Sequence, residues 1–198
     1  VNQVKNGFLR NRLFGNVKLD YQFSPHVSAF VRYSQDLLTE NRETKISKSY
    51  NSELNGYYAL EKIYNTESNT DFLATYANTF KDLSLSASVG GNIQYAYSSD
   101  IQSWSQSKAG IIAPEFFNLS NIAPVNLRSG GGYSQKAIYS LYATTSLGYK
   151  DMAYLDLTGR NDWSSTLPSD NFSYFYPSAS LSLLLNRIFH MNNNISLL

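Results

Sequence analysis

The chain has 198 residues, of which 42% are hydrophobic, 15% aromatic and 16% charged, and its formal net charge is +1. No stretch approaches the roughly 20 consecutive apolar residues of a membrane-spanning helix, which excludes a bundle of such helices. Lys and Arg are scattered along the chain, which excludes a basic nucleic-acid-binding surface. Cysteine is absent, which removes disulfides and thiolate metal sites and fits an exported protein.

The first alternating segment runs from Leu13 to Phe23, with apolar residues at odd positions and, from Asn16 on, polar residues at even positions. A short turn at residues 24–26 follows, and the segment from Val27 to Tyr33 alternates in the same way. Alternation with a period of two predicts β-strands. We therefore expect a hairpin, followed by a long polar loop from Gln35 to Tyr57.

The next pair of predicted strands flanks a two-residue turn at Lys81 and Asp82. One strand runs up to Phe80, and the other alternates apolar residues with serines from Leu83 to Val89. The pattern is irregular from Ser98 to about Gln135. This segment contains prolines and the Gly130–Gly132 run, so we expect a second long loop.

Three more strands are predicted at Ala137–Tyr149, Ala153–Asp162 and Phe175–Leu185, with a short turn at Lys150 and Asp151 and a loop at Ser164–Ser173. Tight turns thus alternate with long loops, as periplasmic turns alternate with extracellular loops in membrane barrels. The predicted fold class is all-β: about seven strands of an antiparallel up-and-down transmembrane β-barrel, with residues 1–198 in a single domain.

A soluble carbohydrate-binding β-sandwich is the main alternative, because its strands also alternate apolar and polar residues. Two features favour the membrane barrel. The predicted strands reach about 10 residues, above the usual 5 to 6 of globular strands. In addition, a sandwich does not require short and long connections to alternate strictly. A passive porin or a barrel adhesin is a second alternative, which would share the strands.

Two local sequence motifs are distinctive enough to compare with known families. Arg160 to Ser165 reads Arg-x-Asp-x-Ser-Ser, and Tyr174 to Leu181 reads Tyr-Phe-x-Pro-Ser-x-Ser-Leu. With the strand, turn and strand before them, they make the segment Ile138–Ser182 resemble the SusC/RagA family of TonB-dependent transporters. Further matches to this family are Arg12–Asn16, Thr79–Phe80 with Leu83–Ser86, and Pro114 with Phe116–Leu119.

The resemblance implies an outer-membrane barrel of about 22 strands closed by an N-terminal plug. The plug, the segment that contacts TonB and the other strands would lie outside this chain, and another strand would begin at Ile195–Leu198. It also implies import of oligosaccharides or peptides together with a SusD-like surface lipoprotein. A homodimer of the transporter–lipoprotein pair is a further candidate assembly.

No catalytic group is expected, because His26 and His190 both lie near predicted tight turns and share no pocket. The chain is therefore predicted not to be an enzyme, and neither a cofactor nor a metal site is predicted. Asp156, Arg160 and Asp162 share one face of a predicted strand, which suits a solvated barrel lumen. The opposite face should contact outer-membrane lipid through Val17, Val31, Leu85, Leu155 and Leu181.

Five aromatic residues are predicted to lie in long loops: Trp104, Phe116, Phe117, Tyr133 and Trp163. Aromatic rings in long loops can stack on a sugar or anchor a partner surface, so we expect contacts to cargo or to the lipoprotein. The alternative is that these rings pack the loops against one another.

Overall fold

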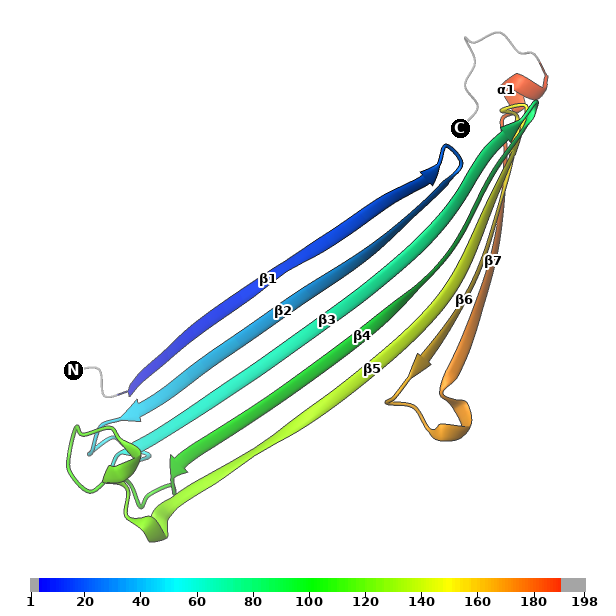
Figure 1. Cartoon of the computed structure of the whole chain (residues 1–198). Helices are drawn as coiled ribbons and strands as arrows, with labels where there is room; N and C mark the ends of the chain where they lie inside the picture. Colours follow the sequence, from blue (N-terminus) through cyan, green and yellow to red (C-terminus); the bar gives the residue numbers. More distant parts are fainter. Residues whose placement is uncertain (1–3, 190–198) are drawn as a thin grey trace. The chain divides into compact units, whose positions relative to one another are not determined.

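The computed structural model describes residues 4–189, for Ser169 the backbone alone, and these residues form one antiparallel sheet (Figure 1). Its strands are neighbours in chain order: β1 (Val4–Ser24), β2 (Val27–Ile46), β3 (Tyr57–Phe80), β4 (Leu83–Ser105), β5 (Leu127–Tyr149), β6 (Ala153–Ser164) and β7 (Ser173–Leu183). The predicted all-β, up-and-down fold class is confirmed. Within residues 4–189 no second sheet packs on this one, so the chain does not form a sandwich.

Short helices occupy the connections and the end of the described chain. Three 3₁₀ helices are η1 (Leu119–Asn121), η2 (Pro124–Asn126) and η3 (Ser169–Asn171), and α1 (Leu185–Ile188) follows β7. Leu185 therefore lies in a helical turn, although we predicted it in a strand. In residues 4–189, no helix is long and apolar enough to cross a bilayer. The predictions for His190 and Ile195–Leu198 lie outside the described residues.

Tight turns occur at the predicted places, residues 25–26, 81–82 and 150–152. At the first, Ser24 Oγ accepts hydrogen bonds from the backbone N–H groups of His26 and Val27, at 3.2 and 3.1 Å. At the third, Lys150 and Asp151 have φ values of 50° and 53°. Left-handed residues of this kind let a short turn follow the twist of the two strands that it joins.

Both predicted long loops are shorter than expected, because strands continue into them. Strand β2 extends to Ile46, β4 extends to Ser105 and β5 begins at Leu127. The loops are therefore residues 47–56 and 106–126. The prediction was wrong for a physical reason: in these extensions both strand faces carry polar residues, so the alternation that identifies a half-buried strand is missing.

The Gly130–Gly132 run lies within β5, although it was expected to interrupt regular structure. Gly131 has a φ of 156°, and a Cβ atom there would lie 2.3 Å from the carbonyl oxygen of Asp100 in β4. Only glycine allows the two backbones to approach this closely. The glycine run therefore permits strand pairing here.

The chain divides into two compact units, and β1 to β5 contribute residues to both. Unit 1 contains Val1–Gly15, Gln35–Glu67 and Ala96–Gln135, and with them the two long loops. Unit 2 contains Asn16–Ser34, Ser68–Tyr95 and Lys136–Leu198, and with them the tight turns. The buried apolar cluster belongs to unit 1: Tyr58, Ile111 and Ile122, with Phe117, Leu119 and Leu127 packed against it.

Candidate functional site

Successive side chains of a strand point to opposite faces of the sheet, and cross-strand contacts show which positions share a face. In unit 2, Arg32 of β2 donates hydrogen bonds to Asp71 of β3 at 2.9 and 2.8 Å, and Asn92 of β4 donates to Asp71 at 2.7 Å. The polar face thus consists of the even-numbered residues of every strand except β3, which contributes its odd-numbered residues. We call the opposite side the apolar face.

In unit 1 the polar face carries ion pairs across three strands. Glu40 of β2 accepts hydrogen bonds from Arg10 of β1 and from Arg42. Arg42 also donates to Glu61 of β3, at 3.1 Å. The Glu40 side chain is 4% exposed, so two guanidinium groups rather than water compensate its charge.

These contacts determine the ionisation of Glu40. The hydrogen bond from Arg42, followed by the one from Arg10, lowers the pKa of Glu40, and desolvation opposes them only in part. Arg12 and Asp36 form a further pair on the same face, with Nε 2.9 Å from Oδ1. The polar face of unit 1 therefore presents balanced, fixed charges.

Strand β6 carries the three residues predicted to face a lumen, and all of them lie on the polar face of unit 2. Arg160 donates from Nε to Asp162 at 2.8 Å and from Nη2 to Ser140 of β5 at 3.0 Å. Asp156 accepts a hydrogen bond from Ser146 of β5. The two carboxylates are thus held by structural partners, which gives no reason to assign them catalytic roles.

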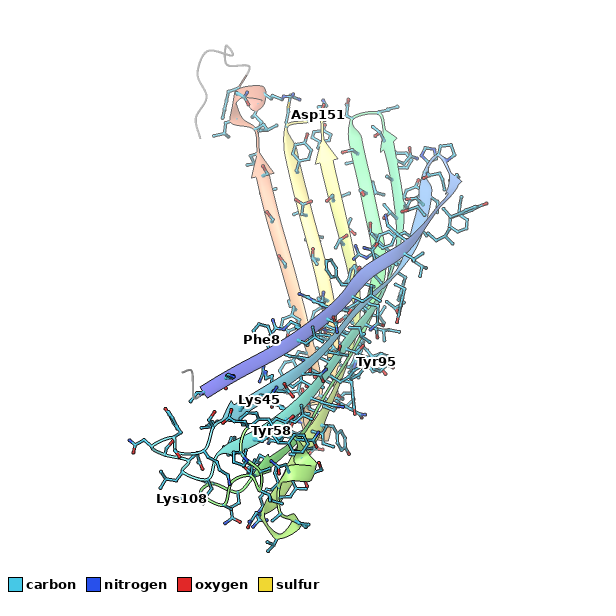
Figure 2. The ribbon with its side chains drawn as sticks, turned by 90° about the vertical axis from the view of Figure 1, so that its left-hand side faces the viewer. Phe8, Lys45, Tyr58, Tyr95, Lys108 and Asp151 are labelled. Carbon is cyan, nitrogen blue, oxygen red and sulfur yellow. The ribbon has the colours of Figure 1, made fainter. Side chains whose placement is uncertain are left out.

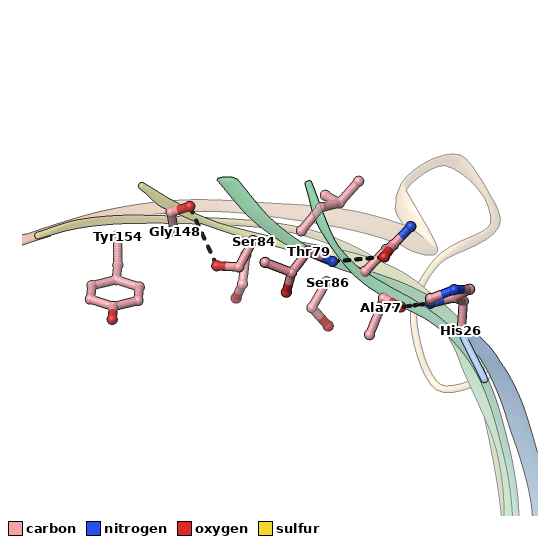
Figure 3. Close-up of a pocket in the computed structure, with 10 residues that line it drawn as sticks. His26, Ala77, Thr79, Ser84, Ser86, Gly148 and Tyr154 are labelled. Carbon is pink, nitrogen blue, oxygen red and sulfur yellow. Dashed lines mark hydrogen bonds between the residues drawn. The ribbon is translucent and has the colours of Figure 1, made fainter. Parts of the chain in front are cut away.

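Near the tight turns, the polar face of unit 2 contains a groove of about 580 Å³. In Figure 3 the labelled side chains of Thr79, Ser84, Ser86 and Tyr154 project from the same side of the ribbon. The Ser84 hydroxyl donates to the carbonyl oxygen of Gly148 at 3.4 Å. Half of the lining residues carry a hydroxyl group, and most of the others are small. The lining residues are His26, Ala77, Asn78, Thr79, Ser84, Leu85, Ser86, Ser146, Gly148 and Tyr154.

The composition of this wall determines what it can bind. Its lining includes no carboxylate, ammonium or guanidinium group. Serine and threonine hydroxyls both donate and accept hydrogen bonds, so they can contact either a peptide backbone or a sugar hydroxyl. Short side chains also leave the groove open. The groove can therefore contact a polar ligand without holding it by charge.

The apolar face of unit 2 carries rows of aliphatic residues. Leu147 of β5 lies opposite Leu155 of β6, which lies opposite Leu181 of β7. Val17, Val31 and Leu181 are exposed, and Leu85 and Leu155 are half-buried. A row of exposed aliphatic residues that continues across several strands is typical of a surface that contacts an apolar partner or lipid.

Aromatic rings border these rows at two levels. Tyr21, Phe23, Phe80 and Tyr149 lie beside the tight turns, and all are exposed. At the other end of unit 2, the rings of Tyr95 and Tyr139 meet edge to face with centroids 5.9 Å apart. The apolar rows thus lie between two sets of aromatic residues.

The two long loops of unit 1 pack together into a cap, residues 47–56 and 106–126, which includes Lys108 (Figure 2). Asn55 Nδ2 donates to the backbone carbonyl oxygen of Lys108 at 2.7 Å, and the backbone carbonyl oxygen of Asn55 accepts from the Ile111 N–H at 3.0 Å. Glu53 accepts from the Lys108 N–H at 2.8 Å. These bonds give the cap one defined arrangement.

A buried amide orders the cap further, and a buried tyrosine hydroxyl joins the two strands beside it. Asn121 donates to the carbonyl oxygens of Ala113 and Phe116, at 2.8 and 2.6 Å, and accepts from the Ala113 N–H at 2.9 Å. Tyr58 donates from its hydroxyl to Glu43 at 2.9 Å. Burial, assisted by the hydrogen bond to Glu43, raises the pKa of Tyr58 to about 12.

The structure separates the five aromatic residues that we predicted to lie in loops. Trp104 lies in β4, Tyr133 in β5 and Trp163 in β6, so for these three the loop assignment was wrong. Phe116 and Phe117 do lie in a loop. The Phe117 ring packs near Tyr58, with centroids 6.4 Å apart, whereas Phe116 is 54% exposed.

Sequence reasoning missed the ion pairs around Glu40, because residues 35–46 were assigned to a loop. The available signal was the two-residue spacing of Arg10 with Arg12 and of Glu40 with Arg42, which places like-spaced charges on one strand face. Among residues 4–189, no group of three or more His, Cys, Asp or Glu side chains could hold a metal ion.

No protein-family model matches the sequence, and no curated protein matches it. Solved structures match the fold: one described as the RagAB peptide transporter, and the RagAB peptide importer in its closed-closed and open-open states, each with a TM-score of 0.88 and 16% identity. The matches cover 97 to 98% of this chain but only 21 to 22% of the other chains, so it spans about a fifth of their length. The fold is that of part of a transporter β-barrel.

Proposed function

We propose that the chain is a section of the barrel wall of a SusC/RagA-type, TonB-dependent importer in the outer membrane of a Gram-negative bacterium. The observation that carries the proposal is the TM-score of 0.88 to the RagAB structures over 97% of the chain. The division of the sheet into an apolar and a polar face supports it independently, because a membrane barrel has lipid outside and water inside.

The spacing of the aromatic residues supports the membrane location. Tyr139 and Tyr149 lie on the apolar face of β5, ten residues apart, and Leu141 and Leu147 lie between them. Ten residues rise about 33 Å along a strand, and at a tilt of about 40° this gives about 25 Å along the membrane normal. The apolar band of an outer-membrane barrel is about 25 Å tall. In this proposal unit 2 spans the membrane.

The same arrangement gives an orientation. The tight turns of unit 2 would face the periplasm, and the cap of unit 1 would lie outside the cell, because outer-membrane barrels have short periplasmic turns and long extracellular loops. Strands β2 to β5 would then extend well beyond the outer leaflet. The ion pairs around Glu40 stabilise such an extension, where neither strand face is immersed in lipid.

The polar face would line the path of the cargo. Outside the membrane its wall carries balanced charges, and near the periplasmic turns it is uncharged and rich in serine and threonine hydroxyls. A cargo would therefore meet fixed charges first and an open, weakly binding groove last, which favours release. In this reading Asp156, Arg160 and Asp162 face the lumen.

The partners follow from the same proposal. A SusD-like lipoprotein would cover the extracellular end, and TonB would act on a plug encoded outside this chain. The structural neighbours are described as peptide transporters and importers, which makes peptides the first cargo to test and oligosaccharides the second. A homodimer of the transporter–lipoprotein pair is part of the proposal.

Uptake by cells that carry the full-length protein tests this function. We expect membrane fractionation to place the protein in the outer membrane, and an affinity tag on it to recover a lipoprotein. We expect uptake of labelled peptides or oligosaccharides to stop when TonB is deleted. Uptake that persists without TonB would instead identify a passive porin, and absence of any uptake with stable surface exposure would favour an adhesin.

A further inference from the structure

Three tyrosines form a continuous row on the apolar face of unit 1. The Tyr97 ring of β4 lies between Tyr64 of β3 and Tyr133 of β5, with centroids 6.1 and 6.5 Å away. Tyr97 and Tyr133 are stacked, with an interplanar angle of 25°. Tyr133 is 75% exposed, Tyr64 is 38% exposed and Tyr97 is half-buried between them, so the row is most accessible at its Tyr133 end.

Strand pairing alone does not explain this row. Cross-strand aromatic pairs stabilise sheets, but packing would be served as well by rings that cover each other and leave little surface. Here the outer ring stays largely in water. Along β4, Tyr97 follows Tyr95, one of the two aromatic rings at the outer end of the apolar rows, by two positions. Aromatic residues at the edge of the apolar band lie at the level of the lipid headgroups, so we place the row at that level.

The chemistry of the row restricts its ligand. The face of an aromatic ring binds the apolar C–H side of a sugar ring, and tyrosine hydroxyls can bond to sugar hydroxyls. Lys62 precedes Tyr64 by two positions on the same face of β3 and is exposed. An exposed lysine on the face that carries the rings adds a contact for a phosphate substituent. Together these groups suit a phosphorylated saccharide.

We propose that the row of Tyr64, Tyr97 and Tyr133, with Lys62, binds the phosphorylated saccharide headgroup of an outer-leaflet glycolipid. The inference rests on the proposed outer-membrane location and deepens it, because it assigns a lipid ligand to the outer wall above the apolar band. This ligand is distinct from the transported cargo, which would contact the polar face. Binding here would anchor the extended strands in the saccharide layer of the membrane.

Titration of the full-length protein in detergent with fluorescently labelled lipopolysaccharide tests the proposal. Tyr97→Ala removes the central ring and should weaken binding about tenfold or more, the change that 1.4 kcal/mol produces. Tyr97→Phe keeps the ring and should bind nearly as well as the wild type. Tyr21→Ala, which removes an exposed ring beside a tight turn, is the matched control and should leave binding unchanged.

Two competitors identify the source of the ligand. We expect unlabelled lipopolysaccharide to displace the probe at the lowest concentration, because its acyl chains hold the headgroup at the detergent surface, and the free core oligosaccharide to do so only at higher concentration. Phosphatidylglycerol in the same detergent should not displace it. Displacement by phosphatidylglycerol would overturn the proposal in favour of general lipid affinity, and displacement by the free saccharide at the same concentration as lipopolysaccharide would overturn the glycolipid assignment.

Folding and the wider function are controlled separately. Heat-modifiable gel mobility reports whether Tyr97→Ala assembles; if it does not, Tyr133→Ala, at the exposed end of the row, replaces it with the same expectation. Wild-type affinity in an assembled variant overturns the inference, while outer-membrane location and uptake remain intact. Failure of the proposed function would instead appear as loss of outer-membrane location or of uptake in the wild type.

Discussion

Leu155 of β6 lies directly opposite Leu181 of β7 in the register of the two strands. Three positions further along β6, Thr158 lies opposite Ser178 on the other face of the same strands. One pair of strands therefore presents an apolar pair to one side and a hydroxyl pair to the other. In the proposed barrel the first faces lipid and the second faces water, which two substitutions can test.

Leu155→Arg should impair assembly of the full-length protein, whereas Thr158→Arg should be tolerated. An arginine on the lipid face costs roughly 2 to 4 kcal/mol at the bilayer midplane and about 0 to 1 kcal/mol near an interface, and a lumen position carries no such cost. Leu155 lies opposite Leu147, two positions from the level of Tyr149, so we expect a cost between these two values. The measurement is the folded fraction after refolding into lipid vesicles, read from heat-modifiable gel mobility. Equal folded fractions for the two variants would contradict the assignment of the faces.

Glu40→Gln should loosen the paired strands of unit 1 at neutral pH. The variant leaves Arg10 and Arg42 without the carboxylate between them, so we expect several-fold faster amide hydrogen exchange in residues 36–44 at pH 7. The pKa of Glu40 is lowered in the folded state. Its contribution to stability is therefore present above the unfolded pKa, about 4.3, and is lost as the pH falls through the folded pKa.

The difference between wild type and Glu40→Gln should accordingly shrink below about pH 4. Glu115→Gln, which alters an exposed glutamate in the cap, is the matched control and should leave exchange in residues 36–44 unchanged. A difference that persists undiminished at low pH would show that the carboxylate charge is not what stabilises these strands.

The sequence predicted those parts of the fold where one strand face meets an apolar environment. Residues 13–33, 83–89 and 137–162 alternate because one side of each strand is apolar, and the tight turns between such segments follow directly. Residues 35–46 and 127–136 do not alternate. Their strands depend on contacts between distant residues, such as Arg10 with Glu40, and pattern analysis of one segment at a time does not detect these.

The same distinction applies to the candidate site, where local sequence patterns predict some of the residues and not others. Asp156, Arg160 and Asp162 could be placed on one face by their even spacing, and in the structure Arg160 contacts Asp162 while Asp156 lies on the same face of β6. The aromatic residues could not be sorted, because Trp104 and Tyr133 were assigned to a loop that proved to be strand. The row that contains Tyr133 requires the register of three strands, which no local motif encodes.

Asn121→Ala should disorder the cap without preventing barrel assembly. Asn121 satisfies three backbone groups of Ala113 and Phe116 in part-buried hydrogen bonds, and each such bond contributes about 0.5 to 1.5 kcal/mol. We expect faster proteolysis within residues 106–126 and unchanged heat-modifiable mobility. Val125→Ser, at an exposed position of the same loop, should change neither.

Phe116→Ala and Phe117→Ala should have different effects, although the two residues are adjacent. Phe117 packs against the buried cluster that contains Tyr58, so its removal should loosen the cap and increase proteolysis of residues 106–126. Phe116 is exposed, so its removal should leave the cap ordered. If the exposed ring contacts the lipoprotein or the cargo, Phe116→Ala should reduce co-purification of the lipoprotein or uptake.

The pair separates a contact role from a packing role, because each variant controls for the other. Hydrogen exchange of the cap measures order, and recovery of the lipoprotein on tagged full-length protein, together with uptake of labelled peptide, measures function. An ordered cap with reduced recovery or uptake in Phe116→Ala assigns the ring to a partner or cargo surface. Normal recovery and normal uptake in that variant would contradict the contact role of Phe116. The cap would then have only a structural role, with Asn121 and Phe117 as the residues that order it.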